Sequence, residues 1–503
     1  MLISLLSTQA QTTITVDPNK PRRNFEGWGM SLCWWAHGVG RWSAANYGHV
    51  VDLLTDSVTG LGYNIFRYNI GGGDQPGHAH MRQYGDIPGY KPTEAGAYDW
   101  TADPYQRNIV ASIVAKGKPV IWEAFSNSPP WWMTISGCAA GNTGGADNLK
   151  PTYFNAFADY LTEVVRHFRD NWGISFRTLE PFNEPSAGWW TINNNQEGCG
   201  FVNNQNGMVK ILGRSLQSKG LTATTIAAAD ENSIADAVTG IGKYDDTALS
   251  FTSQMNVHSY NGKNSRAAYA TVGAQKAKRL WQSESGPLSW PGGNQMDVSL
   301  WMADVIIRDI KEMKVNAWLD WQVLDGGVWG SITPNYTQQT VVPNKRFYMH
   351  AGFSRFIRPG AQIIDSDRDS TMAVWVPSTG NLVLVILNSQ TTNRNYVVDL
   401  SRFNSVPATA TAYRTSTNED LVQQPDVAIQ NQKLTVIAMA RSINTYVVKV
   451  AAPASIIVQK KNRPNSMQPW MRLHQPGLVV FPFGNDARDL RGKAIPILIS
   501  ARK

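Results

Sequence analysis

The sequence predicts a (β/α)8 TIM barrel with an appended antiparallel β-sandwich domain. Three observations predict this fold: a length of 503 residues, an alternation of short apolar runs with helical segments over residues 24–357, and a change to closely spaced short strands over residues 358–450. A barrel of this kind takes about 250 residues or more, so the chain is long enough for both domains.

Eight apolar runs predict the strands of the barrel. They occupy residues 25–32, 64–70, 119–124, 176–181, 225–229, 254–257, 279–282 and 317–322. Their spacing suits βα units, which build a parallel sheet. Residues 153–170 carry apolar side chains at helical spacing, and another helix is expected to begin after Asp297 as its N-cap. Eight strands in this alternation predict a closed barrel.

A different pattern follows the barrel. Short strands are expected at residues 372–376, 382–387, 396–400, 409–413, 434–438 and 445–450. The run 378–381 between two of them is typical of a hairpin turn. These features predict an antiparallel all-β domain, and an early strand within residues 12–23 is expected to join it.

The two chain ends lie outside these domains. Residues 1–11 resemble the end of a signal peptide without its basic part, which favours a secreted, extracellular protein. Residues 451–503 form a basic tail without periodicity, expected to be disordered or foreign to the natural protein. No run approaches the about 18 apolar residues that a membrane span needs, so no membrane partner is expected.

The net charge of +8 arises almost entirely in that tail, where nine Lys or Arg stand against two Asp. The preceding 450 residues carry 37 basic and 36 acidic groups. A basic tail is usually a solvated segment, and no aromatic-and-basic motif accompanies it, so we expect no nucleic-acid partner. The low charged fraction of 17% and the 19 Trp suit an uncharged partner with hydroxyls and apolar faces, such as a sugar, although Trp also fills large cores.

Cysteine and histidine usage predicts neither a disulfide scaffold nor a metal site. Cys33 lies in an apolar run and is expected to be a buried thiol. Cys138 and Cys199 lie in Gly-rich loops, where they either pair or remain separate thiols. No His, Cys or Asp cluster has metal-ligand spacing among the eight scattered His, so we expect no metal and no cofactor.

Two glutamates follow predicted barrel strands, where the active sites of such barrels lie. Glu184 stands in Asn-Glu-Pro after the fourth strand, and Glu284 stands in Ser-Glu-Ser-Gly after the seventh. Glycoside hydrolysis needs such a pair, one group to protonate the leaving oxygen and one to attack or to activate water. The pair therefore predicts an enzyme that cleaves a polysaccharide or oligosaccharide.

The motifs around this pair resemble those of glycoside hydrolase family 30 in clan A. They are Phe-Glu-Gly-Trp-Gly at 25–29, Phe-Arg-Tyr-Asn at 66–69, Ser-Asn-Ser-Pro-Pro-Trp-Trp-Met at 126–133, Asn-Glu-Pro at 183–185, and Glu284. The resemblance covers residues 12–450. It is closest to the endo-β-1,6-galactanases through residues 31–35 and 183–199. That family joins its barrel to a β-sandwich built from both chain ends.

The resemblance implies a retaining mechanism, with the two carboxyl groups about 5–5.5 Å apart. Glu184 would be the general acid/base and Glu284 the nucleophile. We expect Arg67, matching the family's second-strand arginine, to keep Glu284 ionised, and the charge of Glu284 to keep Glu184 protonated. The alternative for Arg67 is a structural ion pair elsewhere in the barrel.

The resemblance also implies substrate contacts. Asn183 is similar to the asparagine that binds the sugar 2-hydroxyl, and His258 and Tyr260 match a pair near the nucleophile. The other candidate sugar contacts are Asn127, Trp28, Trp132, Trp189, Trp190 and Trp321. Trp28 and Trp321 are expected beside the cleaved residue, with Trp189 or Trp190 on the far side.

Several functions remain open. Family 30 also implies a β-1,6-glucanase, a glucuronoxylanase or an exo-acting β-glycosidase as alternatives. A glucuronoxylanase needs cations for its uronate, and no Arg cluster stands out in the expected loops. An inactive carbohydrate-binding protein is the alternative of another class, against which the intact Glu184, Glu284 and Arg67 argue. The chain is expected to act as a monomer.

Overall fold

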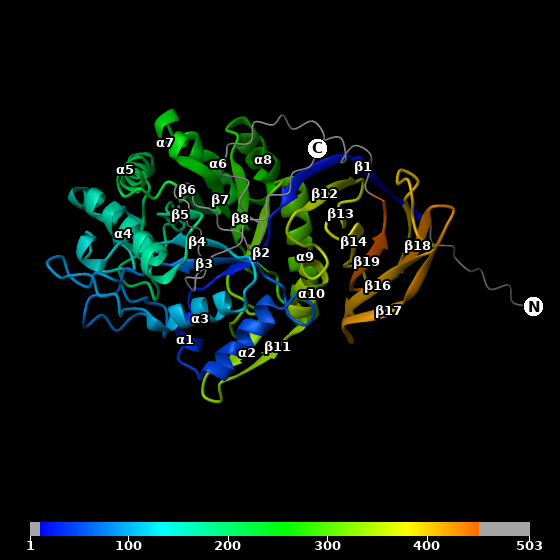
Figure 1. The fold of residues 1–503 in the computed structure, drawn as a ribbon, viewed down its shortest axis with the longest axis horizontal. Coiled ribbons are helices and arrows are strands. Elements are labelled where there is room, and N and C mark those ends of the chain that lie inside the picture. Colours follow the sequence, from blue (N-terminus) through cyan, green and yellow to red (C-terminus); the bar gives the residue numbers. More distant parts are fainter. Residues whose placement is uncertain (1–10, 289, 452–503) are drawn as a thin grey trace, which may run out of the picture. The chain divides into compact units, whose positions relative to one another are not determined.

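Residues 11–288 and 290–451 are described in the computed structural model (Figure 1). Eight strands close into a parallel barrel in chain order. They are β2 (Gly27–Ser31), β3 (Ile65–Asn69), β4 (Ile121–Phe125), β5 (Thr178–Glu180), β6 (Thr225–Ser233), β7 (Thr252–Asn261), β8 (Arg279–Glu284) and β9 (Ala317–Asp320). Each coincides with a predicted run, and the predicted (β/α)8 barrel is confirmed.

Helices follow the strands and lie outside them (Figure 1). They are α1 (Trp35–Val39), α2 (Ala44–Thr55), α3 (Pro104–Ala115), α4 (Phe154–Trp172), α5 (Gln205–Ser218), α6 (Ile234–Gly242), α7 (Asp246–Phe251), α8 (Arg266–Gln275), α9 (Gln295–Glu312) and α10 (Lys345–Ser354), with 3-10 turns η1 (Trp131–Met133), η2 (Thr143–Gly145), η3 (Pro151–Tyr153) and η4 (Lys263–Ser265). The predicted apolar stripe of α4 is buried, including Phe157, Leu161 and Phe168. Because helices cover the outside and side chains fill the inside, strands such as β2 and β3 are buried at every position.

Helix α9 begins three residues earlier than the sequence predicted. Its N-cap is Asn294, whose side chain accepts hydrogen bonds from the backbone of Met296 and Asp297. Asp297 occupies the third helical position and accepts a hydrogen bond from the Asn294 backbone. The prediction that Asp297 is the N-cap was therefore wrong, because Asp297 is the reciprocal partner in a capping box.

Nine further strands form the second, mainly antiparallel sheet region. They are β1 (Thr12–Phe25), β12 (Ala361–Ser366), β13 (Thr371–Val376), β14 (Asn381–Asn388), β15 (Arg394–Asp399), β16 (Thr409–Ser416), β17 (Glu419–Gln430), β18 (Lys433–Ala438) and β19 (Ser442–Lys449). Strand β1 pairs antiparallel with β12 and then parallel with β15, while β17 pairs with both β16 and β18. Strands β1 and β17 therefore connect the two sheets within this second region. The early strand belongs to this region as predicted.

Strands β12 and β17 were not predicted. Strand β17 alternates between half-buried and exposed positions without a fully buried one, and it contains Pro425. Its sequence therefore lacks the apolar run by which strands were recognised, and its pairing with β16 and β18 identifies it. A short β10 (Ile332–Asn335) and β11 (Thr340–Pro343) hairpin also lies between β9 and α10.

The three cysteines are free thiols. Cys138 Sγ lies near Asp74 and His80, whereas Cys199 Sγ contacts the carbonyl of Gly200, so the disulfide that the sequence left open does not form. The signal-peptide prediction, except for residue 11, and the tail prediction, except for residue 451, lie outside the described residues.

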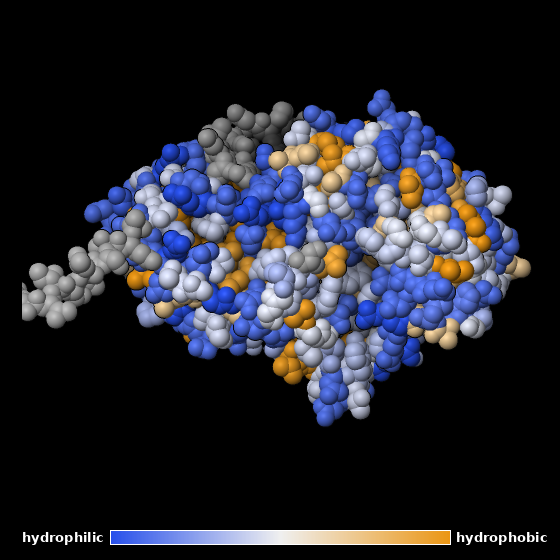
Figure 2. Space-filling model, turned by 180° about the vertical axis from the view of Figure 1, so that it is seen from behind, coloured by the Kyte–Doolittle hydropathy of each residue, from blue (hydrophilic) through white to orange (hydrophobic). Residues whose placement is uncertain are grey.

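The face shown in Figure 2 is mainly hydrophilic. Figure 2 shows hydrophobic residues in separate small groups on one face. Exposed large side chains such as Val58, Val342 and Ile437 are distant in sequence and belong to different elements. Within residues 11–288 and 290–451, none of the helices has the length and apolar character to cross a bilayer.

Candidate active site

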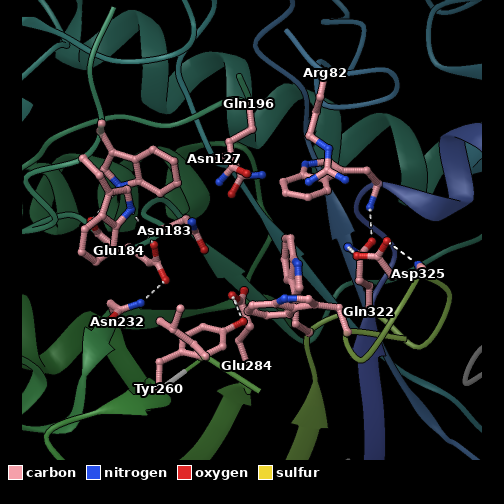
Figure 3. Close-up of a pocket in the computed structure, with 17 residues that line it drawn as sticks. Arg82, Asn127, Asn183, Glu184, Gln196, Asn232, Tyr260, Glu284, Gln322 and Asp325 are labelled. Atoms are coloured by element: carbon pink, nitrogen blue, oxygen red, sulfur yellow. Dashed lines mark hydrogen bonds between the residues drawn. The ribbon is translucent and has the colours of Figure 1, made fainter. Parts of the chain in front are cut away.

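Glu184 and Glu284 meet at the C-terminal end of the barrel (Figure 3). Glu184 follows β5 and Glu284 is the last residue of β8. One carboxylate oxygen of each, together with a ring nitrogen of His258 from β7, lie within 4.8 Å of one another. The two side chains are nearly buried, with exposed fractions of 8% and 5%.

Three donors surround the carboxylate of Glu184. Asn232 Nδ2 donates to Oε1 at 2.7 Å, and His258 Nδ1 lies 3.0 Å from the same oxygen. The indole N–H of Trp189 donates to Oε2 at 3.2 Å. The backbone of Glu184 has φ of +48° and is held by a 2.8 Å hydrogen bond to the Asp230 carbonyl. A left-handed conformation is costly for glutamate, and here it orients the carboxylate into the cavity.

Glu284 is held mainly through one of its oxygens. Tyr260 donates from its hydroxyl to Oε1 at 2.9 Å, and His258 Nδ1 lies 3.4 Å from that oxygen. Arg67 Nη1 lies 3.8 Å from Oε2, which is beyond hydrogen-bond distance. Within the described residues no group donates a hydrogen bond to Oε2. One oxygen of Glu284 is therefore positioned and the other is left without a donor.

Arg67 contacts two other carboxylates more closely than Glu284. Its Nε donates to Glu123 Oε1 at 2.8 Å, and its Nη2 donates to Asp230 Oδ2 at 2.5 Å. The side chains of Arg67, Glu123 and Asp230 are fully buried. The charge of Arg67 is thus shared among three acids, and the ion pair with Glu284 is the longest of them.

Electrostatics around the pair differ from the sequence expectation. Burial raises the pKa of Glu284 to about 8, helped by Glu184 and Asp230 and opposed by His258 and Arg67. Burial by itself lowers the pKa of His258, but Glu284 and Asp230 outweigh it and raise this pKa to about 10. Arg67 therefore does not suffice to keep Glu284 ionised, because Asp230 and Glu123 take up most of its charge. The imidazolium of His258 lies between the two carboxyl groups.

Asp230 keeps a fixed negative charge below this pair. Burial alone raises the pKa of Asp230, but Arg67 and His258 outweigh burial and hold it well below its usual range. Ser283 donates a hydrogen bond to Oδ1 at 2.6 Å, and His258 Nε2 lies 3.3 Å from the same oxygen. Asp230 therefore stabilises His258 in its charged form.

A cavity of about 580 Å³ opens above the two glutamates (Figure 3). It is lined by Trp34, Arg82, Asn127, Asn183, Glu184, Trp189, Trp190, Gln196, Asn232, Tyr260, Glu284, Leu288, Trp321, Gln322, Asp325, Gly326 and Trp329. Of the residues singled out from the sequence, the cavity brings together both glutamates with Asn127, Asn183, Tyr260, Trp189, Trp190 and Trp321. His258 is buried and does not line the cavity.

Indole rings lie on two sides of the pair. Trp189 is 47% exposed and contacts Glu184, whereas the buried Trp190 donates its indole N–H to the Glu184 carbonyl at 2.9 Å. Trp321 packs edge-on against Trp34, with ring centroids 5.1 Å apart. Of the two adjacent tryptophans, Trp189 therefore offers an open face and Trp190 supports the loop.

The structure corrects the placement of Trp28. This side chain is buried among Phe25, Trp318 and Phe353, and its indole N–H donates to the Ile357 carbonyl at 2.8 Å. Trp28 is the second residue of β2 and therefore lies near the strand start, on the face that packs against α10. The prediction that it lies beside a bound sugar was wrong.

Trp132 also lies outside the cavity lining. It belongs to η1, is 8% exposed, and donates its indole N–H to the Lys91 carbonyl at 3.0 Å. Its ring packs edge-on against Tyr153. The loop after β4 turns this side chain into the protein, so the prediction of a sugar contact was wrong.

Several residues of the site were not recognised from the sequence. Asp230 and Asn232 follow the predicted strand 225–229, so the strand-end rule that found Glu184 could have found them. Trp34 lay inside a recognised motif but was not selected. Arg82 and Trp329 come from long loops, where no local pattern distinguishes a cavity residue from a surface residue.

Comparison with known proteins agrees with this geometry. Residues 11–266 match the family model for O-glycosyl hydrolase family 30. The chain is 30% identical over 401 residues to an endo-β-1,6-galactanase from Hypocrea rufa, covering 76% of this chain and 82% of that protein. The chain belongs to glycoside hydrolase family 30.

Solved structures share the fold of this family 30 glycoside hydrolase. A conserved exported protein from Bacteroides fragilis has a TM-score of 0.75 at 19% identity, covering 87% of this chain and 100% of that one. The catalytic domain of family 30 xylanase C from Talaromyces cellulolyticus has a TM-score of 0.67 at 21% identity, covering 87% and 99%.

In this family 30 enzyme the cavity at the two glutamates does not suit a metal ion, although Glu184, His258 and Glu284 offer three clustered ligand atoms. A metal would need an unprotonated ring nitrogen. His258 Nδ1 lies at hydrogen-bond distance from Glu184, and the raised pKa of His258 keeps a proton on that nitrogen. The trio is therefore a proton-sharing network.

Proposed function

We propose that this family 30 enzyme is a retaining endo-β-1,6-galactanase that uses Glu184 as general acid/base and Glu284 as nucleophile. The observation that carries the mechanism is the close approach of the two carboxylates, with an oxygen of each within 4.8 Å of the other. Retaining enzymes need carboxyl groups about 5–5.5 Å apart, whereas inverting enzymes leave room for a water molecule at about 6.5–9.5 Å.

The first step requires Glu184 to carry a proton and Glu284 to be ionised. Glu184 donates that proton to the leaving oxygen while Glu284 attacks the anomeric carbon, forming the glycosyl-enzyme. In the second step Glu184 takes a proton from water, and the resulting hydroxide displaces Glu284. Because the pKa of Glu284 is raised to about 8, this carboxyl must lose its proton before it can attack.

The contacts to Glu284 favour one attacking atom. Tyr260 and His258 hold Oε1, so Oε2 is the oxygen left to bond to the sugar. The hydrogen bond from Tyr260 would then weaken as the glycosyl-enzyme forms, since it is stronger to the ionised carboxylate than to the ester.

The aromatic residues support cleavage within a chain. Trp189 contacts the proposed acid, so we expect it beside the leaving sugar, and Trp34 with Trp321 lines another part of the cavity. The sugars on both sides of the cleaved bond would each stack on an indole ring. Asn183, which lines the cavity, is the proposed partner of the sugar 2-hydroxyl.

The galactan assignment rests on the relative from Hypocrea rufa. Glucuronoxylan is the alternative substrate that one observation favours. Arg82 lines the cavity with its guanidinium 4.4 Å above the Trp34 ring, and a cation there could hold a uronate. We propose that the enzyme is secreted and works as a monomer on polysaccharide.

Activity on a polysaccharide panel tests the substrate. Reducing-sugar release and product size are measured on β-1,6-galactan, β-1,6-glucan and glucuronoxylan. Galacto-oligosaccharides of several lengths at early times support the proposal. Cleavage of glucuronoxylan that is lost in Arg82→Ala would replace the galactanase assignment with a glucuronoxylanase. Release of a single small product would indicate an exo-acting enzyme.

Azide rescue tests the two roles. With an activated aryl galactoside, Glu184→Ala should form the β-galactosyl azide, because azide replaces water in the second step. Glu284→Ala should form the α-galactosyl azide, because azide replaces the nucleophile. Glu312→Gln, a carboxylate change on the outer helix α9, serves as the control and should keep full activity. The reverse stereochemistry would exchange the two assignments.

A further inference from the structure

A second cluster of metal-ligand residues lies apart from the two glutamates. Asp74, His78 and His80 belong to the loop that follows β3, and Cys138 belongs to the loop that follows β4. One ligand atom from each of the four lies within 4.8 Å of all the others. The cluster was not recognised from the sequence because Cys138 is far from the other three residues along the chain.

The spacing of these atoms suits a tetrahedral ion. Asp74 Oδ1 lies 3.4 Å from Cys138 Sγ and 3.2 Å from His78 Nδ1, and His80 Nε2 lies 3.5 Å from Cys138 Sγ. For a tetrahedral zinc ion bound by nitrogen, oxygen and sulfur, neighbouring ligand atoms are about 3.3–3.8 Å apart.

Groups outside the cluster orient its ligands. His80 Nδ1 lies 2.7 Å from the Asn194 carbonyl, which only accepts, so this nitrogen carries the proton and Nε2 turns its lone pair toward Cys138. The backbone N–H of Ala140 donates to Cys138 Sγ at 3.4 Å. Metal-binding histidines characteristically donate their other ring N–H to a carbonyl or carboxylate in this way.

The side chain of Asp74 is an independent indication of a bound cation. Its side chain is 6% exposed, and Oδ2 is buried without a hydrogen-bond donor among the residues that the structure describes. Burying a carboxylate oxygen without a partner is costly. A cation in the cluster would remove that cost. A thiolate and a carboxylate with two neutral imidazoles also balance the charge of a divalent ion.

We propose that Asp74, His78, His80 and Cys138 form a structural Zn²⁺ site. Thiolate and imidazole ligands select Zn²⁺ over Mg²⁺ and Ca²⁺, which take oxygen ligands. Binding replaces the thiol proton of Cys138, which passes to solvent, with a Zn–S bond. No oxidation or reduction is involved.

The site would join three loops at the mouth of the barrel. Besides the loops that carry the ligands, it contacts the loop after β5 through the Asn194 carbonyl and through the Ile192 carbonyl, which lies 3.7 Å from Cys138 Sγ. The same loop carries Trp189, which donates to Glu184. Zn²⁺ would therefore stabilise the loop that presents Trp189 to the cavity.

Zinc binding by the full chain tests the site. The protein is stripped with a chelator, and Zn²⁺ is titrated in competition with a chromophoric chelator, with Mg²⁺ and Ca²⁺ as comparison. We expect one equivalent of Zn²⁺ and a higher Tm with Zn²⁺ than with chelator. Cys138→Ser and His78→Gln should each weaken binding by more than the about 10- to 100-fold typical of losing an outer-shell partner.

Matched variants separate ligand loss from misfolding. Cys199→Ser removes another buried thiol, and His49→Gln removes an exposed histidine of α2, so both should keep Zn²⁺ affinity. The partly exposed His78 is a substitution that the fold should tolerate. Co²⁺ bound to the wild type should show a thiolate charge-transfer band that is absent from Cys138→Ser.

No measurement here depends on the glycosidase activity, so the proposed function and the metal site can fail separately. A chain that binds no Zn²⁺ and keeps its Tm in chelator overturns the site. Zn²⁺ affinity equal in wild type, Cys138→Ser and His78→Gln would also overturn it.

Discussion

His258 lies within hydrogen-bond distance of Glu184, with 3.0 Å between Nδ1 and Oε1. The same nitrogen lies 3.4 Å from Glu284, and the opposite ring nitrogen faces Asp230. One imidazole is thus surrounded by three acids. Its charge state affects both proposed catalytic groups and the stability of the barrel.

The first prediction concerns the pH dependence of stability. The folded-state pKa of His258, about 10, lies above the ordinary value of about 6.5. Protonated His258 therefore stabilises the fold fully below about pH 6.5, and this stability is lost as the pH rises toward 10. The Tm difference between wild type and His258→Gln should shrink over that range. A difference that grows with pH would contradict the assignment, and His49→Gln should show no such trend.

Removing the Tyr260 hydroxyl should slow catalysis without unfolding the protein. A hydrogen bond to a charged group contributes about 1.5–3 kcal/mol, so Tyr260→Phe should lower kcat/KM by about 10- to 100-fold. Tyr244→Phe removes another buried hydroxyl, which donates to Gln205 at 3.2 Å away from the glutamates, and serves as the control. Equal activity of wild type and Tyr260→Phe would mean that the hydroxyl does not act on Glu284.

Arg67 should matter for stability as well as turnover. Arg67→Ala leaves Glu123 and Asp230 buried without their cation, which typically costs about 3–5 kcal/mol. Denaturant unfolding measures that loss, and the folded fraction should still show a lower kcat with KM little changed. Arg308→Ala, a half-exposed ion pair on α9, should change stability little. A raised KM with normal kcat would count against a role beside Glu284.

Trp189 and Trp28 should respond in opposite ways. Trp189→Ala removes an exposed cavity ring, and losing about 1 kcal/mol of stacking raises KM roughly fivefold. Trp28→Phe leaves the Ile357 carbonyl without its donor, costing about 1–3 kcal/mol of stability with KM unchanged. Kinetics and thermal unfolding on both variants check this. A raised KM in Trp28→Phe would instead indicate that Trp28 contacts the substrate.

Local pattern predicted most of the fold. Barrel strands buried on both faces are continuous apolar runs, and all eight were recognised because burial dictates their composition. Strand β17 was missed since its stability comes from pairing with β16 rather than from its own apolar side chains. The start of α9 was misplaced because Asn294 and Asp297 cap it together, and either residue alone is a plausible N-cap.

Strand ends predicted where chemistry is located but not which way each side chain points. Glu184 and Glu284 could be found because parallel strands of a barrel end at one mouth. Trp28 and Trp132 were misplaced, since an indole ring packs equally well into a core or against a sugar. The closest ion-pair partners of Arg67 are Asp230 and Glu123, which come from two other strands.

The sequence by itself determined the barrel, the early strand of the second sheet region and the pair of strand-end glutamates, because each follows from local composition and chain order. Only the tertiary structure decided that Arg67 is shared among three acids, that His258 lies between the glutamates, and that Cys138 joins Asp74, His78 and His80. These relationships depend on distances of a few ångströms between residues far apart in the chain, and such distances are set by packing.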